Sequence, residues 1–247
     1  MTRARHGRGE IAGVLGAGAA VASARRATPT AIAGLPTELT SHDLGAFAIR
    51  LVAVRDLESQ LDRERLLADE EYEPPYWALL WSGSALLARQ VAESFDCTGR
   101  WVLDAGCGLG LTALAAARRG GAVVALDRDR TAVQFVRASA QENELRVMAL
   151  AGDLLELPFR RRFEIILAGE ILYDAAGFDR LANALSGALA PGGVLWIADA
   201  RRVDTAGFFA AAERWGLTLA TTRECEVREE GSLVRVHLSQ WRRPEVE

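Results

Sequence analysis

The pattern of hydrophobic and polar residues becomes regular after residue 95. Short apolar runs there alternate with segments in which apolar residues recur every three or four positions. The apolar runs predict strands at 101–105, 122–127, 146–152, 163–169 and 192–199, and the intervening periodic segments predict helices at 112–119, 131–142, 178–189 and 205–215. Strands that alternate with helices in this way predict a parallel sheet with helices on both faces.

The end of the chain follows a different pattern. Two strand-like runs, LTLATTRECEV and SLVRVHLSQW, are joined by REEGS with no helix between them, which predicts an antiparallel hairpin at the edge of the sheet. We therefore expect an α/β fold: a Rossmann-like, doubly wound, seven-stranded sheet with a C-terminal antiparallel hairpin.

The first part of the chain is less regular. Residues 1–36 are rich in Ala, Gly and Arg and predict a flexible extension, whereas residues 46–54 predict a strand. The charged stretch RDLESQLDRERLLADEE fits a helix or a charged loop, and YEPPYWALLW then leads into an aromatic-rich helix that ends near Ser94. We divide the chain into an extension (1–36), a segment packing over the ligand site (37–94) and a core (95–247).

The N-terminus also has the outline of an export signal. A basic start is followed by the apolar run IAGVLGAGAAVA and by Ala22-Ser23-Ala24, which resembles a cleavage site. The run is too short to span a bilayer. We expect a disordered extension, or a start codon placed too early, rather than an export signal, and we expect a cytoplasmic protein without a membrane partner.

Composition excludes several classes of protein. With 33 acidic and 29 basic residues the net charge is −4, which argues against duplex nucleic acid as the main partner. The three cysteines are scattered, so neither a disulfide framework nor a metal site is expected. A reducing compartment fits this cysteine usage.

The first strand of the regular region ends in LDAGCGLGL, residues 103–111. Gly106, Gly108 and Gly110 allow the backbone to turn tightly and to approach a ligand just before a helix. The G-x-G-x-x-G fingerprint of dinucleotide sites is not met, because leucine or alanine stands at the third glycine position. Asp104 at the strand end would repel a pyrophosphate and attract a cationic ligand.

Two more carboxylates follow the next strands. Asp127 ends the second strand and can accept hydrogen bonds from both hydroxyls of a ribose. Asp153 follows the third strand and can accept from an adenine amino group, although it could equally cap a helix. Acids around a glycine loop suit a nucleoside that carries positive charge, and S-adenosyl-L-methionine, with its ammonium and sulfonium, is such a ligand.

These residues match a known family. VLDAGCGLGL resembles motif I of the class I, seven-stranded S-adenosylmethionine-dependent methyltransferases, and the resemblance extends from about Tyr72 to Trp241. PPYWALLWSGSALLARQV together with LAGEILYD resembles the family 16 methyltransferases. That family includes protein-lysine methyltransferases, among them the enzyme that acts on the beta subunit of electron transfer flavoprotein, and bacterial relatives described as nicotinamide N-methylases.

The resemblance implies particular roles. Trp81 in WSG corresponds to a tryptophan that lies against the cofactor, and Glu170 to Tyr173 correspond to a D-x-x-Y motif lining the acceptor pocket, with Glu in place of Asp. The relatives' GDP at the end of the fifth strand is here ADA, residues 198–200. The expected cofactor-binding residues are Trp81, Asp104, Gly106, Gly108, Gly110, Asp127, Asp153, Leu154 and Gly169.

Methyl transfer requires an aligned acceptor with a free lone pair. We hypothesise that Glu170 binds and orients an incoming amine and that Tyr173 lines the acceptor pocket. These two residues are therefore the catalytic candidates. The leading expectation is an N-methyltransferase that acts on a protein lysine. The alternatives are a methyltransferase that acts on a small molecule through N or O, a non-catalytic protein that binds an adenosyl ligand, and a nicotinamide-dependent oxidoreductase.

Overall fold

The structure is a computed structural model and describes residues 28–61, 65, 68, 73–160, 162–229 and 232–245. The expectations for residues 1–27, including the three interpretations of the apolar run, lie outside the described residues. So do eight of the seventeen residues of the charged stretch 55–71, and within its described part Leu57–Gln60 form the short helix η1.

The alternation of strands and helices predicted after residue 95 is confirmed. The elements are β4 (Trp101–Ala105), α3 (Leu111–Arg118), β5 (Ala122–Asp127), α4 (Arg130–Glu142), β6 (Val147–Ala151), β7 (Phe163–Gly169), α5 (Phe178–Ala188), β8 (Leu189–Asp199), α6 (Ala206–Arg214), β9 (Thr218–Glu229) and β10 (Ser232–Arg242). Among the described residues, no helix combines the length and the hydropathy needed to cross a membrane.

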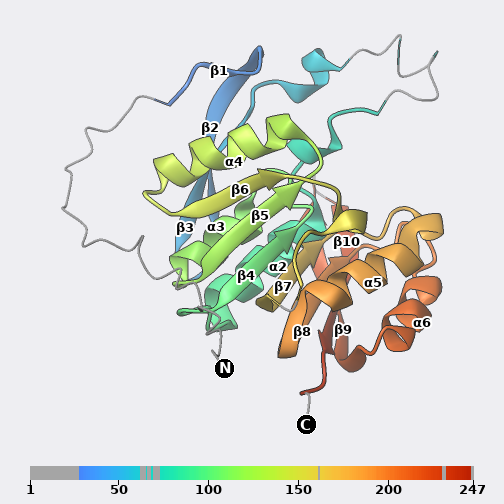
Figure 1. Cartoon of the computed structure of the whole chain (residues 1–247). Coiled ribbons are helices and arrows are strands. Elements are labelled where there is room, and N and C mark those ends of the chain that lie inside the picture. The colour runs from blue at the N-terminus through green and yellow to red at the C-terminus, as the bar shows by residue number, and fades with distance from the viewer. Residues whose placement is uncertain are drawn as a thin grey trace, which may run out of the picture.

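The seven-stranded sheet has the order β6-β5-β4-β7-β8-β10-β9 (Figure 1). The first five of these strands are parallel to one another, and β10 pairs antiparallel with both β8 and β9. The strand order reverses at β4, which has β5 on one side and β7 on the other. Ligands of such sheets bind beyond the carboxyl ends of the strands at this reversal.

The central strands of the sheet are buried on both faces. Along β7, Ile165 and Leu167 pack in the core formed with α2 (Ser82–Ser94), α3 and α4, whereas Ile166 and Ala168 pack in the core formed with α5 and α6. Successive side chains of a strand point to opposite faces, so a strand between two helical layers must be apolar throughout. This explains the continuous apolar run that ends at Gly169.

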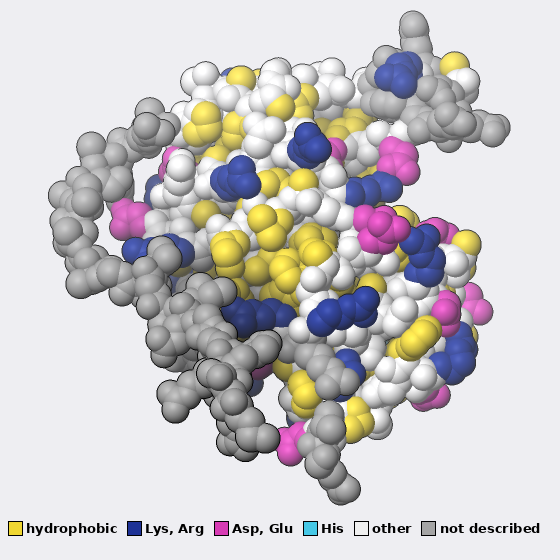
Figure 2. Space-filling model, viewed as in Figure 1, with side chains coloured by type: hydrophobic (Ala, Val, Ile, Leu, Met, Phe, Trp, Pro, Cys, Tyr) yellow, Lys and Arg dark blue, Asp and Glu magenta, His cyan; other side chains and the backbone are white. Residues whose placement is uncertain are grey.

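The connection between β6 and β7 contains only the short helix η3 (Leu154–Glu156) among its described residues. The face of β6 that a helix would otherwise cover therefore remains open. Figure 2 shows hydrophobic side chains gathered over β5 and β6, and Met148 and Leu150 of β6 are exposed.

The N-terminal segment forms a second, three-stranded sheet from β1 (Ala31–Ile32), β2 (Leu35–Asp43) and β3 (Ala48–Val54). The strand expected at 46–54 is confirmed as β3. The boundary of the flexible extension at residue 36 is wrong, because residues 31–32 and 35–36 lie in strands. The edge of β3 is held by α4, whose Ser139 hydroxyl accepts from the Val52 N–H at 2.9 Å.

The aromatic stretch before α2 is not part of that helix, contrary to expectation. Residues Tyr76–Ala78 form the short helix η2, Leu79 and Trp81 are extended, and α2 begins only at Ser82. The indole N–H of Trp81 donates to the carbonyl of Tyr76 at 3.0 Å. This bond holds the stretch as a turn rather than as a continuous helix.

The C-terminal hairpin extends past the end of the sheet. His237 of β10 pairs with Asp199, the last residue of β8, so residues 232–236 of β10 continue beyond that strand. They pair with residues 225–229 of β9. The hairpin therefore projects as an arm beyond the carboxyl edge of the sheet.

Candidate active site

The glycine loop follows β4 at the reversal of strand order. Gly106, Gly108 and Gly110 have φ values of 70°, 49° and 80°, a left-handed conformation in which glycine is favoured. The N–H groups of Gly106 and Cys107 donate to the Leu126 carbonyl at 2.9 and 3.0 Å, which ties the loop to β5. The predicted loop is thus confirmed as a tight turn at the ligand edge.

The walls of this loop come from segments distant in the sequence. A Cβ on Gly106 would lie 2.8 Å from Cγ2 of Ile171, and one on Gly108 would lie 3.0 Å from the carbonyl oxygen of Trp77. Leu154 also faces the loop, with its Cδ1 3.5 Å from the Cβ position of Gly106. The segment before α2 and the segment after β7 therefore approach the loop closely.

Asp127 lies directly beside the loop, as expected. Its Oδ2 accepts from the Gly108 N–H and its Oδ1 from the Asp129 N–H, each at 2.9 Å. A carboxylate oxygen has two lone pairs, so each oxygen can still accept one more hydrogen bond. Burial raises the pKa of Asp127, and the two N–H groups oppose that shift. The side chain is thus fixed in place with capacity left for a pair of hydroxyls.

Asp104 does not present an open carboxylate at this edge, and that expectation is wrong. Its side chain is 2% exposed, and Oδ2 accepts from the Ala113 N–H of α3 at 2.8 Å. Burial raises the pKa of this group from 3.8 to about 7. Because strand residues alternate between faces, Asp104 points beneath the glycine loop and supports the start of α3.

The buried Asp104 predicts a pH dependence of stability. Because the folded protein holds its proton more tightly than the unfolded chain does, the free energy of unfolding should fall as pH rises from about 4 to about 7. Asp104→Asn keeps an acceptor for Ala113 and removes the titration. We expect the stability of this variant relative to the wild type to increase between pH 5 and pH 8 in urea unfolding. Parallel curves for the two proteins would contradict the assignment.

Asp153 is the cap of a short helix, the alternative that the sequence left open. Its Oδ1 accepts from the Leu155 N–H of η3 at 2.8 Å, and the residue is exposed. The contact with adenine remains a prediction.

Glu170 joins three segments: the end of β7, the end of β8 and the first turn of α2. Its Oε1 accepts from the Gly83 N–H at 2.9 Å, and its Oε2 accepts from the Ala200 N–H at 3.2 Å. Arg202 lies nearby, with Nε 3.9 Å from Oε2. The side chain is 6% exposed, and burial raises its pKa while the N–H donors and Arg202 oppose that shift.

These contacts change the interpretation of Glu170. Two backbone N–H groups and a guanidinium surround the carboxylate, and one of them belongs to the first turn of α2, where negative charge is favourable. The residue also has φ of 57°, a left-handed conformation that is uncommon for a residue other than glycine. The left-handed backbone and the buried side chain of Glu170 indicate that this residue positions other segments.

Gly83 and Gly169 are required by packing around this carboxylate. A Cβ on Gly83 would lie 2.7 Å from both the Ala198 carbonyl oxygen and Oε1 of Glu170, and one on Gly169 would lie 2.8 Å from Cα of Ser84. The glycine of WSG therefore lets the start of α2 reach the ends of β7 and β8. Gly169 serves this close approach, and its expected cofactor contact remains a prediction.

Replacing Gly83 by alanine tests this packing. We expect the variant to lose about 1–3 kcal/mol of stability, or roughly 3–10 °C in Tm, because the new methyl group meets a backbone carbonyl. Gly207→Ala in α6 is a matched control, since its Cβ would meet only Cδ2 of Phe178 at 3.5 Å. Differential scanning fluorimetry should show an unchanged or higher Tm for the control, and an equal Tm for both variants would contradict the packing argument.

Trp81 lies between the segment before α2 and the loop after β8. The guanidinium carbon of Arg202 lies 4.7 Å from the centroid of its ring, and Tyr76 contacts the ring from another side. A stacked guanidinium stabilises an aromatic ring by cation–π attraction. The predicted contact of Trp81 with the cofactor remains a prediction, and the structure adds Arg202 as its neighbour.

The side chain of Tyr173 is exposed, at 61%. Partial burial of its phenol end nevertheless raises its pKa, and the positive charge of Arg128 opposes the shift. Arg128 forms an ion pair with Glu73, which links the segment before α2 to the end of β5. Tyr173 thus projects from the ligand edge near the charges of Asp127 and of this ion pair.

Comparison with known proteins identifies the domain that contains this edge of the sheet. Residues 102–193 match the family model described as a methyltransferase domain, a range that runs from β4 into β8 and includes the glycine loop, Asp127, Glu170 and Tyr173. Residues 102–193 therefore form a methyltransferase domain, and the strand order of the sheet agrees with the class I, S-adenosylmethionine-dependent fold. The domain's cofactor is S-adenosylmethionine, as expected.

Two curated relatives are protein methyltransferases. The electron transfer flavoprotein beta subunit lysine methyltransferase of Danio rerio is 36% identical over 109 residues, which are 43% of this chain and 42% of that protein. The ribosomal protein L11 methyltransferase of Pelotomaculum thermopropionicum is 37% identical over 151 residues, 60% of this chain and 46% of that protein. The chain thus spans less than half the length of either relative.

A solved structure shares the fold of the methyltransferase domain. Magnesium protoporphyrin IX methyltransferase from Synechocystis PCC 6803, solved with SAH bound, has a TM-score of 0.56 at 16% identity and covers 75% of this chain and 94% of its own. At that identity the likeness concerns the fold alone, which does not specify a substrate.

The residues of the domain fit the cofactor. Asp127, beside the glycine loop, retains lone pairs for two ribose hydroxyls. The sequence did not reveal Arg202, the Arg128–Glu73 ion pair or the partners of Glu170. These contacts join residues far apart in the chain, so they depend on the strand order and leave no local pattern.

Proposed function

We propose that this protein is an S-adenosylmethionine-dependent N-methyltransferase that acts on a lysine side chain of another protein. The observation that carries the proposal is the match of residues 102–193, because that range contains the strand ends that form the candidate site. Relatives named as protein methyltransferases and the exposed Tyr173 beside Asp127 support a protein acceptor. We also propose that it acts in the cytoplasm, where S-adenosylmethionine is made.

The cofactor supplies a methyl group on a sulfonium, which the amine lone pair takes as the sulfur–carbon bond breaks, leaving S-adenosylhomocysteine and a methylated ammonium. In the proposed site, Asp127 holds the ribose and the glycine loop accommodates the backbone of the cofactor. Alignment and exclusion of water are the main requirements of such a transfer.

The acceptor must arrive as a neutral amine. A free lysine has a pKa near 10.4, so the amine is mostly protonated at neutral pH, and an apolar surrounding favours the neutral form. Ile171, which lies over Gly106, and Tyr173 provide such surfaces after β7. The proton released from nitrogen passes to water at this exposed edge.

We propose that Glu170 is a positioning residue for this reaction. Because its oxygens already accept from Gly83 and Ala200, the carboxylate fixes the start of α2 next to Trp81 and the turn whose Arg202 stacks on that ring. This differs from direct capture of the amine, and it explains the extra methylene of Glu relative to Asp. The longer side chain reaches from β7 to the first turn of α2.

Incubation with tritiated S-adenosylmethionine and an extract of the organism that encodes the protein tests the proposal. We expect label in a protein band, and less of it with Tyr173→Phe. Label confined to the small-molecule fraction would instead identify a metabolite methyltransferase. Cofactor binding without transfer to any fraction would indicate a binding protein.

A further inference from the structure

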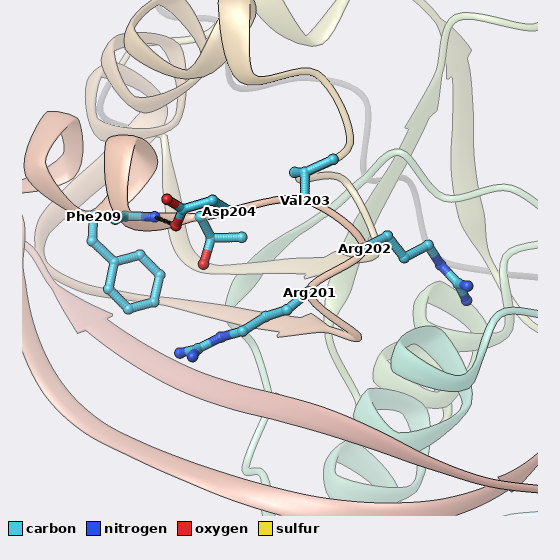
Figure 3. Close-up of a pocket in the computed structure, with 7 residues that line it drawn as sticks. Arg201, Arg202, Val203, Asp204 and Phe209 are labelled. Carbon is cyan, nitrogen blue, oxygen red and sulfur yellow. Dashed lines mark hydrogen bonds between the residues drawn. The ribbon is translucent and has the colours of Figure 1, made fainter.

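A pocket of about 500 Å³ opens directly after β8. It is lined by residues 201–206 of the loop and by Phe209 of α6 (Figure 3). β8 is the neighbour of β7 in the sheet, so the pocket lies at the same edge as Glu170 and one strand further from the glycine loop. This is the side of Glu170 away from the glycine loop and Asp127.

The two arginines of the pocket point in opposite directions (Figure 3). Arg202 is engaged by the candidate site, with its guanidinium over the Trp81 ring and its Nε 3.9 Å from Glu170. Arg201 points the other way, and its guanidinium carbon lies 5.9 Å from the centroid of the Phe209 ring. The guanidinium of Arg202 therefore belongs to the candidate site, whereas that of Arg201 lies next to Phe209.

Arg201 is held in place and forms no ion pair within the described part of the chain, although its positive charge opposes the rise in the pKa of Asp199. Its backbone N–H donates to Oδ1 of Asp199 at 2.6 Å, and its φ of 51° is a left-handed conformation. Within the described part of the chain, no carboxylate lies within 4.0 Å of its guanidinium nitrogens. Asp204 lines the same pocket, but its Oδ1 accepts from the N–H of Ala206, the first residue of α6, at 3.0 Å.

An exposed guanidinium on an aromatic platform is suited to a carboxylate. The guanidinium offers five donors in a planar fork that matches both oxygens of a carboxylate, and the ring limits its rotamers. Because Arg201 points away from Glu170 and Trp81, the anion that it binds is separate from the group that accepts the methyl. The arm formed by residues 225–229 and 232–236 projects on this side and can support an extended chain.

We propose that Arg201, with Phe209 as its platform, binds the carboxylate of an Asp or Glu side chain close in sequence to the acceptor lysine. This inference rests on the proposed function and specifies its substrate as an acidic lysine-containing segment. A subsite for the negative charge that is separate from the methyl-acceptor site fits a peptide substrate, in which a lysine and an acidic residue lie close in sequence.

Paired peptides test the inference. Each pair has one lysine and either Glu or Gln at a single position within three residues of it, and kcat/KM is measured with S-adenosylmethionine. We expect the wild type to favour one Glu peptide by roughly tenfold, the value of one hydrogen bond between charged groups. Arg201→Gln should reduce this ratio to about one and leave the rate on the Gln peptide unchanged.

Arg180→Gln is the matched control, because Arg180 is an exposed arginine of α5 that pairs with Glu156 and is not among the residues that line the pocket. It should retain the wild-type ratio. No preference for any Glu peptide in the wild type, or an equal preference in Arg201→Gln, would overturn the inference while lysine methylation stands. Absence of methylation of every lysine peptide and protein would overturn the proposed function and the inference together.

Discussion

Asp127→Ala should weaken the binding of S-adenosylmethionine by roughly 100-fold or more. The expected contacts are two ribose hydroxyls donating to a carboxylate, each worth about 1.5–3 kcal/mol. The geometry favours this role because each oxygen of Asp127 accepts only one backbone N–H and retains a lone pair. Isothermal titration calorimetry with S-adenosylmethionine and with S-adenosylhomocysteine measures the change.

Two further variants test whether the loss of affinity depends on the charge of Asp127 and whether it is specific to this position. Asp127→Asn keeps an acceptor oxygen and should lose less affinity than Asp127→Ala. Asp179→Ala makes the same change on the exposed surface of α5, where the carboxylate pairs with Arg214, and should bind as the wild type does. An affinity of Asp127→Ala within about threefold of the wild type would show that the ribose lies elsewhere.

Glu170→Ala should lose both stability and turnover. Removing the carboxylate leaves the N–H groups of Gly83 and Ala200 without their acceptor and costs about 2–4 kcal/mol of stability. Turnover should fall because Trp81 and Arg202 lose their fixed positions. Urea unfolding and a methyl-transfer assay on the same preparations measure the two effects.

Glu164→Ala is a matched control on the same strand. Its Oε2 accepts from the Trp101 N–H at 2.9 Å, so the contact is of the same kind, but it lies at the opposite end of β7. This variant should lose about 1 kcal/mol and keep its turnover. If Glu170→Ala kept full stability and still lost turnover, the carboxylate would act directly on the acceptor. Full turnover would exclude both roles.

The sequence predicts most of the core and little of the N-terminal sheet. Apolar runs such as 163–169 identify their strands because the sheet is covered on both faces, and each glycine of the loop is required by its φ. β2, with the sequence LPTELTSHD, has no such run, because it pairs with β3 away from the main core. Its strand character comes from a partner that a local pattern does not reveal.

The residues of the candidate site likewise divide into those whose role the sequence predicts and those whose role depends on the fold. Asp127 could be assigned because its place at a strand end and its neighbouring loop are local features. Asp104 could not be oriented, because its burial depends on α3 lying across it. Glu170 bonds to Gly83, which is 87 residues earlier in the chain, so its role as a joint becomes visible only once the order of strands and helices is known.

Identification of the methylated atom tests the central claim most directly. After reaction with tritiated S-adenosylmethionine and an extract, the labelled protein band is hydrolysed in acid and its amino acids are separated, with Asp127→Ala as the inactive control. The account predicts label that elutes as methylated lysine and is absent with Asp127→Ala. Label in another amino acid, label only in small molecules, or equal labelling by the control would contradict it.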